Sequence, residues 1–307
     1  MKIYNCIKDF KPVINTVATV GTFDGVHLGH QAIFNMMKEK AAEIEGETVV
    51  ITFYPHPRIV LGLDSKNLKF INTQEKKINR LQESGIDHLI IVPFNKEFAN
   101  ISSEEFINDL ILEKVNPKTI VIGYDHHFGK DREGSFEMLS EIGKRKEIEV
   151  INVEAQYVND VTVSSTKIRK LLKVGKIVAV NNFLGYEYSI TGTVVKGQSI
   201  GRNIGFPTAN IEVADEYKLI AAVGVYACHV EYMGKTYKGM SNIGYRPTID
   251  HGDLTIEVNI FNFDKQIYDE EITIIFVDRM RDEQKFENIE ALKAQLVRDK
   301  DAALKIL

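Results

Sequence analysis

The pattern of apolar segments changes near the middle of this chain, and that change constrains the fold more than any other feature. Between residues 16 and 168, short apolar runs alternate with segments whose apolar residues recur every three or four positions. Such alternation predicts parallel strands joined by helices. Beyond about residue 187, β-branched runs are separated by glycine and turn residues, which is typical of antiparallel sheet. A chain of 307 residues is long enough for two such domains.

The first region contains apolar runs that we interpret as strands and amphipathic segments that we interpret as helices. The predicted strands are Thr16–Val20, Thr48–Phe53, His88–Val92, Thr119–Ile122 and Ile148–Val153. The predicted helices are Leu28–Ile44, Thr73–Gln82, Ser102–Glu113 and Ser135–Lys146, followed by Lys167–Lys173 and Val178–Phe183. We therefore expect residues 1–183 to form a doubly wound, Rossmann-like α/β domain with a parallel sheet.

The second region predicts a different fold class. Its expected strands are Tyr188–Val195, Val223–Glu231, Lys235–Asn242, Leu254–Asn262 and Glu271–Val277, and its last predicted helix is Ile289–Leu304. Their spacing suggests that residues 184–307 form a small antiparallel β-barrel with a C-terminal helix.

Charge and cysteine content exclude some classes of function. The formal net charge of -5 argues against a general affinity for nucleic acid, which is bound by clustered Lys and Arg. Two cysteines, Cys6 and Cys228, do not suggest a disulfide framework. The first residues lack a signal-peptide pattern, and no apolar run approaches the length of a membrane span. We expect a cytoplasmic protein without a nucleic-acid or membrane partner, and the sequence does not indicate its oligomeric state.

The segment Gly21–His30, GTFDGVHLGH, connects the first predicted strand of the α/β region to a helix. Glycines let the backbone approach an anion, and the free N–H groups at a helix start attract phosphate. His27 and His30 are three residues apart and fall on one helix face, where both can donate to phosphate oxygens. Two alternatives remain: histidines that are solvated or cap the helix, and a zinc site, which lacks a matching third ligand.

His27-Leu28-Gly29-His30 resembles the HxGH signature of the nucleotidyltransferase superfamily, and the longer segment is similar to the form found in FAD synthetases. Further segments agree with this resemblance: Phe53–Pro57, Gly123–Gly129 and Ser164–Arg169. The third segment differs from the usual pattern, because His126 stands where the family carries an aromatic residue.

The resemblance implies that the FMN phosphate attacks the α-phosphorus of ATP and that pyrophosphate leaves. It implies catalytic roles for His27, His30 and Arg169. The implied ATP-binding residues are Gly21, Phe23, Asp24, His27, His30, Ser164, Ser165 and Arg169, and the implied flavin-binding residues are Phe53, His56, Pro57 and Asp125. For Asp24 and Asp125, orientation of the nucleotide or its magnesium and a loop-capping role are equal alternatives.

A second glycine-dense segment, Gly197–Asn210, lies in the barrel region. It has too many glycines for a regular strand, so we interpret it as a mobile, phosphate-embracing loop. Its end, Pro207-Thr208-Ala209-Asn210, resembles the PTAN signature of riboflavin kinases. The resemblance implies that Thr208 and Asn210 bind Mg²⁺ and the ATP phosphates, through the oxygen ligands that a hard cation prefers.

Two later segments extend this second resemblance. Asn242–Thr248 is similar to the NxGxRPT pattern of the same family, and Arg279–Phe286 resembles its C-terminal motif. Glu257 alternates with Ile256 and Val258 along a predicted strand and therefore faces the opposite side. An acidic residue there is usually solvent-exposed, but the resemblance implies that Glu257 is the general base for the riboflavin hydroxyl. The resemblance also implies ATP binding by Gly197, and flavin binding by Gly201, Arg202 and Arg281.

Together, the resemblances imply a prokaryotic-type bifunctional enzyme that converts riboflavin to FMN and FMN to FAD, with ATP as co-substrate and Mg²⁺ as cofactor. One alternative is a member with a single activity. Another is a flavin-binding regulatory protein that uses the same folds without turnover.

Overall fold

The structure is a computed structural model that describes residues 1–62, 68–124, 128–130, 133–197, 201, 204–245 and 254–307. The chain divides into two compact units, Met1–Ser165 and Thr166–Leu307. The division falls after the first residue of helix α6 (Ser165–Lys173) and precedes helix α7 (Ile177–Leu184). Helix α7 packs against a strand of the second unit, β14 (Glu271–Arg281). A domain boundary between residues 183 and 184 stays a prediction.

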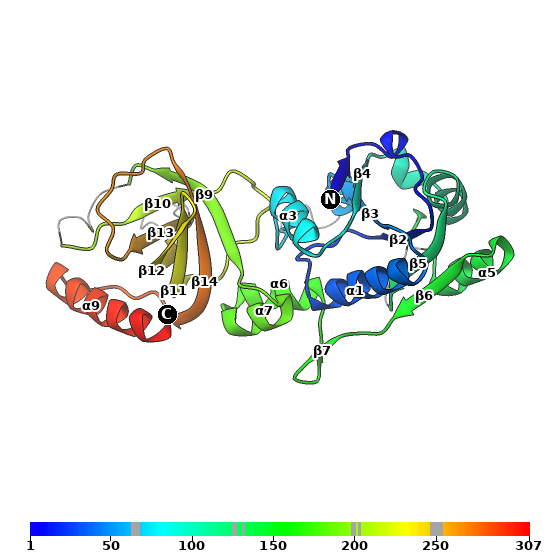
Figure 1. The fold of residues 1–307 in the computed structure, drawn as a ribbon. Helices are drawn as coiled ribbons and strands as arrows, with labels where there is room; N and C mark the ends of the chain where they lie inside the picture. Colours follow the sequence, from blue (N-terminus) through cyan, green and yellow to red (C-terminus); the bar gives the residue numbers. More distant parts are fainter. Residues whose placement is uncertain (63–67, 125–127, 131–132, 198–200, 202–203, 246–253) are drawn as a thin grey trace. The chain divides into compact units, whose positions relative to one another are not determined.

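The first unit contains a parallel sheet of six strands in the order β1-β4-β3-β2-β5-β6 (Figure 1). Its strands are β1 (Lys2–Tyr4), β2 (Thr16–Val20), β3 (Thr48–Tyr54), β4 (His88–Pro93), β5 (Pro117–Gly123) and β6 (Glu149–Val153). The predicted strands are confirmed within two residues at each end, and β1 was not predicted. A short antiparallel hairpin, β7 (Tyr157–Val158) and β8 (Val161–Thr162), follows the sheet.

Helices cover both faces of this sheet, so the prediction of a doubly wound fold is confirmed. On one face, Val17 and Val50 pack with Phe34 of α1 (Leu28–Glu43) and Leu81 of α3 (Gln74–Glu83). On the other face, the neighbouring strand residues pack against the segment 106–112 and α5 (Phe136–Lys146). Alternate strand residues therefore point into two separate cores, which explains why the runs are apolar throughout.

One predicted helix differs from its expected form. The predicted helix Ser102–Glu113 is a single turn, α4 (Ser103–Glu105), continued by a π-helix, η3 (Phe106–Leu112). Other short helices are η1 (Ile7–Asp9), α2 (Pro57–Val60) and η2 (Phe98–Asn100).

The order of the strands identifies where this sheet can bind a ligand. From β2 the chain adds β3 and β4 on one side, and then returns to add β5 and β6 on the other. The carboxyl ends of β2 and β5 therefore flank a topological switch point, which is the usual ligand site of an open parallel sheet. The segment Gly21–His30 begins at the carboxyl end of β2.

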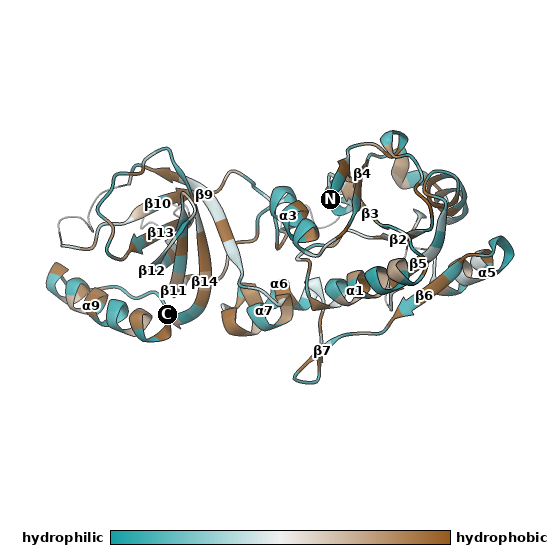
Figure 2. Ribbon diagram, in the orientation of Figure 1, coloured by the Kyte–Doolittle hydropathy of each residue, from teal (hydrophilic) through white to brown (hydrophobic). Residues whose placement is uncertain are grey.

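The second unit is a closed antiparallel barrel in the order β10-β13-β12-β11-β14-β9, as predicted for its fold class (Figure 1). Its remaining strands are β9 (Ser189–Val195), β10 (Ala209–Glu212), β11 (Gly224–Tyr232), β12 (Lys235–Tyr245) and β13 (Leu254–Ile260). The C-terminal helix α9 (Ile289–Ile306) packs against β11, β12 and β14. Figure 2 shows α9 with apolar and polar residues interspersed along its length, as expected for a helix that covers one side of a barrel.

One prediction for this barrel needs correction. Ala209 and Asn210 were assigned to a phosphate-embracing loop, but they begin β10, which pairs with both β9 and β13. Gly197 supports this arrangement, because a Cβ atom there would lie 2.1 Å from Nδ2 of Asn210.

Candidate active sites

The turn that follows β2 has an unusual backbone. Phe23 and Val26 adopt φ angles of 50° and 40°, and Gly25 between them has φ of 87°. Positive φ is costly for a β-branched residue such as valine, and such strain costs roughly 1–3 kcal/mol per residue. Val26 and Phe23 are both buried, so the surrounding packing holds the turn in place. Strain concentrated at the carboxyl end of a sheet suggests a functional site.

Both predicted histidines lie at the start of α1, next to this turn. His27 is the N-cap residue, and its side chain does not cap the helix. The rings of His27 and His30 stack with centroids 3.6 Å apart, and His30 also meets the Phe23 ring edge-on at 5.2 Å. A Cβ atom at Gly29 would lie 3.2 Å from the His27 ring, so the glycine leaves space for that ring. The helix start therefore offers backbone N–H groups and two imidazoles to an anion.

The environment keeps His30 uncharged. Burial lowers the pKa of His30 well below its usual value, and the nearby His27 and Lys77 lower it further. The Nδ1 atom of His30 is buried and has no hydrogen-bond partner among the described residues. A neutral imidazole can still donate one hydrogen bond, so His30 can bind a phosphate oxygen without carrying a charge in the free protein.

Part of the predicted Ser/Thr-rich segment, Ser164–Arg169, contacts the turn after β2. Ser165 donates its hydroxyl to the backbone oxygen of Asp24 at 2.9 Å, although 141 positions separate the two residues. Ser164 directly precedes α6. Arg169 lies four residues further along α6 and belongs to the second compact unit.

Asp24 has the contacts of a loop-tethering residue. Its carboxylate accepts hydrogen bonds from Ile71 N at 2.9 Å and from Asn72 N at 3.3 Å, and the residue is 5% exposed. These contacts match the capping alternative for Asp24, in which the carboxylate holds the segment around Ile71 against the turn.

We expect Asp24→Ala to lower the free energy of unfolding of the N-terminal domain by about 2 kcal/mol, because buried backbone amides would lose a charged acceptor. Urea unfolding followed by circular dichroism measures this change, with Asp109→Ala at an exposed position as the control. Unchanged stability combined with weaker ATP binding would instead favour the nucleotide-orienting alternative.

Three of the predicted flavin-side residues of this domain lie at or just after the end of β3, with Phe53 in the strand and His56 and Pro57 directly after it. The Phe53 ring belongs to an aromatic cluster, with centroids 5.7 Å from Phe94 and 5.8 Å from Phe98. His56 caps α2 by accepting a hydrogen bond from Arg58 N at 3.1 Å, and Pro57 begins that helix. Asp125 and the divergent His126 lie outside the described residues.

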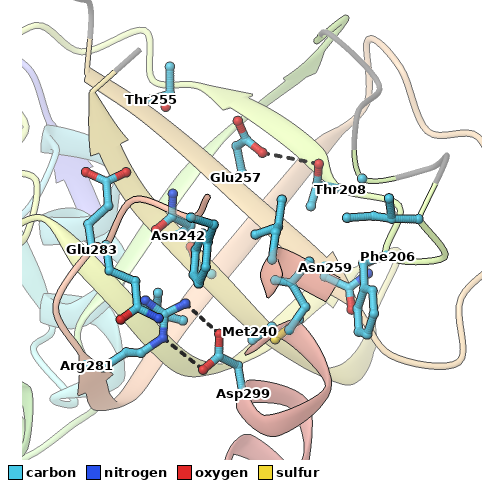
Figure 3. A pocket seen from close by; sticks show the side chains of 18 of the residues that line it. Phe206, Thr208, Met240, Asn242, Thr255, Glu257, Asn259, Arg281, Glu283 and Asp299 are labelled. Atoms are coloured by element: carbon cyan, nitrogen blue, oxygen red, sulfur yellow. Dashed lines mark hydrogen bonds and ion pairs between the residues drawn. The ribbon is translucent and has the colours of Figure 1, made fainter. Parts of the chain in front are cut away.

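The barrel unit contains a cavity of about 420 Å³ lined by β10, β12, β13, the end of β14 and α9 (Figure 3). Its volume suits a cofactor-sized ligand. Thr255, Glu257 and Asn259 alternate along β13 and all line the cavity, while Ile256 and Val258 are buried on the other face. The predicted orientation of Glu257 is therefore confirmed.

The register of the strands brings three polar residues into one row. Glu257 pairs directly with Asn210 of β10 on one side and with Asn242 of β12 on the other. The Thr208 hydroxyl donates to Oε2 of Glu257 at 3.3 Å (Figure 3). Asn259 donates to the Pro207 carbonyl at 2.6 Å and so fixes the chain that carries Thr208. Oxygen atoms from the predicted residues Thr208, Asn210 and Glu257 thus gather at one wall of the cavity.

Gly201 and Arg281, both predicted to bind flavin, also line this cavity, and Arg202 lies outside the described residues. Arg281 makes a paired contact with Asp299 of α9, with Nε–Oδ1 at 2.9 Å and Nη2–Oδ2 at 2.6 Å (Figure 3). Asp299 is 3% exposed and also accepts a hydrogen bond from Gln295. In this structure Arg281 therefore fastens α9 to the barrel and forms part of the cavity wall.

Sequence reasoning missed several residues of the two sites. Asn242, the first residue of the NxGxRPT resemblance, could have been included from its motif. Asn259 follows Glu257 by two positions and could have been included from strand alternation. Lys77 and Asp299 had no such signal, because each becomes recognisable only through its partners in the fold.

Two further observations concern metals and membranes. Within the described ranges, no group of three or more His, Cys, Asp or Glu side chains is arranged to hold a metal ion. No helix among those residues combines the length and the apolar character needed to cross a membrane.

Two different family models match separate parts of this chain. The FAD synthetase family model matches residues 11–167, and the riboflavin kinase family model matches residues 184–307. A bifunctional riboflavin kinase/FMN adenylyltransferase of Listeria monocytogenes is 39% identical over 287 residues, covering 93% of this chain and 90% of the relative. The Bacillus subtilis protein of the same name is 37% identical over 293 residues, covering 94% and 92% respectively.

A solved structure covers both units. It is described as a macrolide-efflux protein from Streptococcus pneumoniae, and it matches with a TM-score of 0.90 and 31% identity over 98% of this chain and 97% of that one. Both family models and the curated relatives name the same pair of activities. The chain therefore belongs to the family of bifunctional riboflavin kinases/FMN adenylyltransferases, enzymes that use ATP to make FMN and then FAD.

Proposed function

We propose that the barrel cavity is the riboflavin kinase site and that Glu257 is its general base. The observation that carries this proposal is the row Asn210–Glu257–Asn242 at the cavity wall, with Thr208 in contact with Glu257. The carboxylate takes the proton from the ribityl 5′-hydroxyl as that oxygen attacks the γ-phosphorus of ATP. The bond from the γ-phosphorus to the bridging oxygen breaks, and ADP leaves.

Thr208 and Asn210 are the proposed magnesium ligands. Hydroxyl and amide oxygens suit this hard cation, and a nearby carboxylate adds negative charge, so the donor set fits. When bound, Mg²⁺ would neutralise charge on the ATP phosphates. The residues of the chain have separate tasks: Asn259 holds the Pro207–Thr208 backbone, and Gly197 leaves space for Asn210.

For adenylyl transfer, we place ATP at the strained turn after β2 and at the start of α1. His27 and His30 bind the triphosphate and stabilise the charge that develops on it, while Gly21 and Phe23 provide close backbone approach. Ser164, Ser165 and Arg169 bind the β- and γ-phosphates. An oxygen of the FMN phosphate attacks the α-phosphorus, and pyrophosphate leaves. Phe53, His56, Pro57 and Asp125 form the flavin side.

A magnesium titration tests the metal assignment. We expect Asn210→Ala to raise the Mg²⁺ concentration required for half-maximal riboflavin phosphorylation by about tenfold, because one oxygen ligand is lost. The same variant should keep an unchanged Mg²⁺ requirement for adenylylation of supplied FMN. An unchanged requirement in the kinase reaction would contradict the assignment of Asn210 as a ligand.

We also propose that the protein works in the cytoplasm. Cys6 and Cys228 are both free, which suits a reducing compartment.

A further inference from the structure

Lys77 is a buried cation in the N-terminal unit that the roles above do not use. It lies on α3 and is 7% exposed. Its ammonium donates to the Thr22 carbonyl and to Oγ1 of Thr52, each at 3.3 Å. Thr22 belongs to the strained turn after β2, and Thr52 lies near the carboxyl end of β3. Lys77 therefore sits at the sheet edge where the ATP site is proposed.

Both hydrogen-bond acceptors of Lys77 are neutral oxygens. Among the described residues, Lys77 makes no ion pair, and the negative group that acts on its charge is Asp24. The carboxylate of Asp24 is engaged by the amides of Ile71 and Asn72. A buried charge that is only partly compensated is costly to keep, and such groups concentrate at functional sites.

The contact with Thr22 also orients a backbone N–H group, that of Phe23, which can donate a hydrogen bond to a phosphate. In a trans peptide the C=O and N–H groups point in opposite directions. Because Lys77 holds the Thr22 oxygen, the N–H of Phe23 faces the other side of that peptide. Phe23 N–H makes no hydrogen bond within the described chain, so it is available to an anion. Lys77 thus holds the peptide plane, together with the Thr52 hydroxyl, which donates to the same oxygen at 3.5 Å, and only Lys77 adds a positive charge behind it.

We propose that Lys77 is a positioning residue of the adenylyl-transfer site, which holds the Thr22–Phe23 peptide toward the ATP phosphates and supplies a fixed positive charge to the turn. The proposal rests on the placement of ATP at this turn. A purely structural tie between the turn and β3 is the alternative, and a neutral hydrogen-bond donor would serve that purpose equally well.

The pH dependence of the charge separates the two roles. Burial lowers the pKa of Lys77 to about 8, while Asp24 acts in the opposite direction. The titratable groups that face Lys77 are Asp24, on the turn, and His30, on α1. Above pH 7 His30 is already neutral, because its pKa lies well below its usual value. Lysine is charged in its low-pH form, so the positive charge is present at pH 7 and is lost as the pH rises through about 8.

The test measures kcat and KM for ATP in the conversion of supplied FMN to FAD, with wild type, Lys77→Gln, Lys77→Arg and Lys76→Gln. Lys76 is the matched control, since it is the adjacent lysine on α3 and is less buried. We expect Lys77→Gln to raise KM for ATP about tenfold or more, Lys77→Arg to stay within about threefold of wild type, and Lys76→Gln to be unchanged. In wild type kcat/KM for ATP should fall above about pH 8, whereas in Lys77→Arg it should not.

Several outcomes would overturn the proposal. Wild-type kinetics in Lys77→Gln, or equal losses in Lys77→Gln and Lys77→Arg, would indicate that the charge has no role. Should Lys77→Gln fail to fold, as judged by thermal unfolding, the pH profile of the wild type decides, and a flat profile between pH 7 and 9 contradicts the proposal. Absence of FAD formation by the wild type would instead contradict the placement of adenylyl transfer in this domain.

Discussion

Replacing Glu257 with glutamine is expected to reduce the rate of FMN formation from riboflavin by roughly 10²- to 10⁴-fold, the usual contribution of a positioned general base. Glutamine has nearly the same shape, and its amide oxygen can still accept the hydrogen bond from Thr208. The substitution therefore removes the proton acceptor and leaves the row with Asn210 and Asn242 in place. The loss should appear in kcat, because the proton moves only in the transition state.

Chromatographic separation of riboflavin, FMN and ADP over time measures this effect. The matched control is Glu231→Gln, an exposed glutamate on the barrel strand β11. Adenylylation of supplied FMN should remain normal in both variants. A loss of less than tenfold in Glu257→Gln would contradict the general-base role. It would favour the alternative that Glu257 is an ordinary polar strand residue without a catalytic role.

Replacing His30 with alanine should have the converse effect on the two activities. The N–H of a neutral imidazole at the start of α1 can stabilise the charge that develops during adenylyl transfer, and removal of one such donor typically costs about 10² or more in kcat. We expect that loss in FAD formation from FMN, with riboflavin phosphorylation unchanged. KM for ATP should change less than kcat, since the proposed interaction strengthens in the transition state.

His30→Gln distinguishes this role from packing against Phe23. Its amide can donate a hydrogen bond, so part of the lost rate should return if donation is the function of His30. If His30→Ala lowers kcat less than tenfold, His30 does not stabilise the transition state. If both variants unfold at a lower temperature and lose activity in parallel, packing explains the effect.

The elements with a regular pattern of apolar residues over many positions could be predicted from sequence. The alternating strands and helices around β2 and α1 have strong local periodicity, and the barrel strands have turn residues between them. Strands β1 and β10 were missed because they contain only three and four residues, too few for a recognisable period. Their existence depends on pairing with β4, and with β9 and β13, which no local pattern encodes.

The same distinction holds for the sites: residues in local motifs could be predicted, and residues whose role depends on contacts distant in sequence could not. Motifs identified His27, Thr208 and Glu257, because the chemistry of each depends on its immediate neighbours in sequence. The contacts of Asp24 depend on amides 47 and 48 positions away, so its sequence left two alternatives open. Lys77 occurs in the charged stretch Gln74–Arg80, where nothing distinguishes a buried lysine from an exposed one.

The central claim is that one chain carries two independent active sites, one in each domain. Mixing the Glu257→Gln and His30→Ala variants with riboflavin, ATP and Mg²⁺ tests it most directly. Each variant alone should fail to make FAD from riboflavin, since the first cannot form FMN and the second cannot adenylylate it. Together they should make FAD, with FMN from the second variant as substrate for the first. FAD formation from riboflavin by either variant alone at the wild-type rate, or none from the mixture, would contradict the claim.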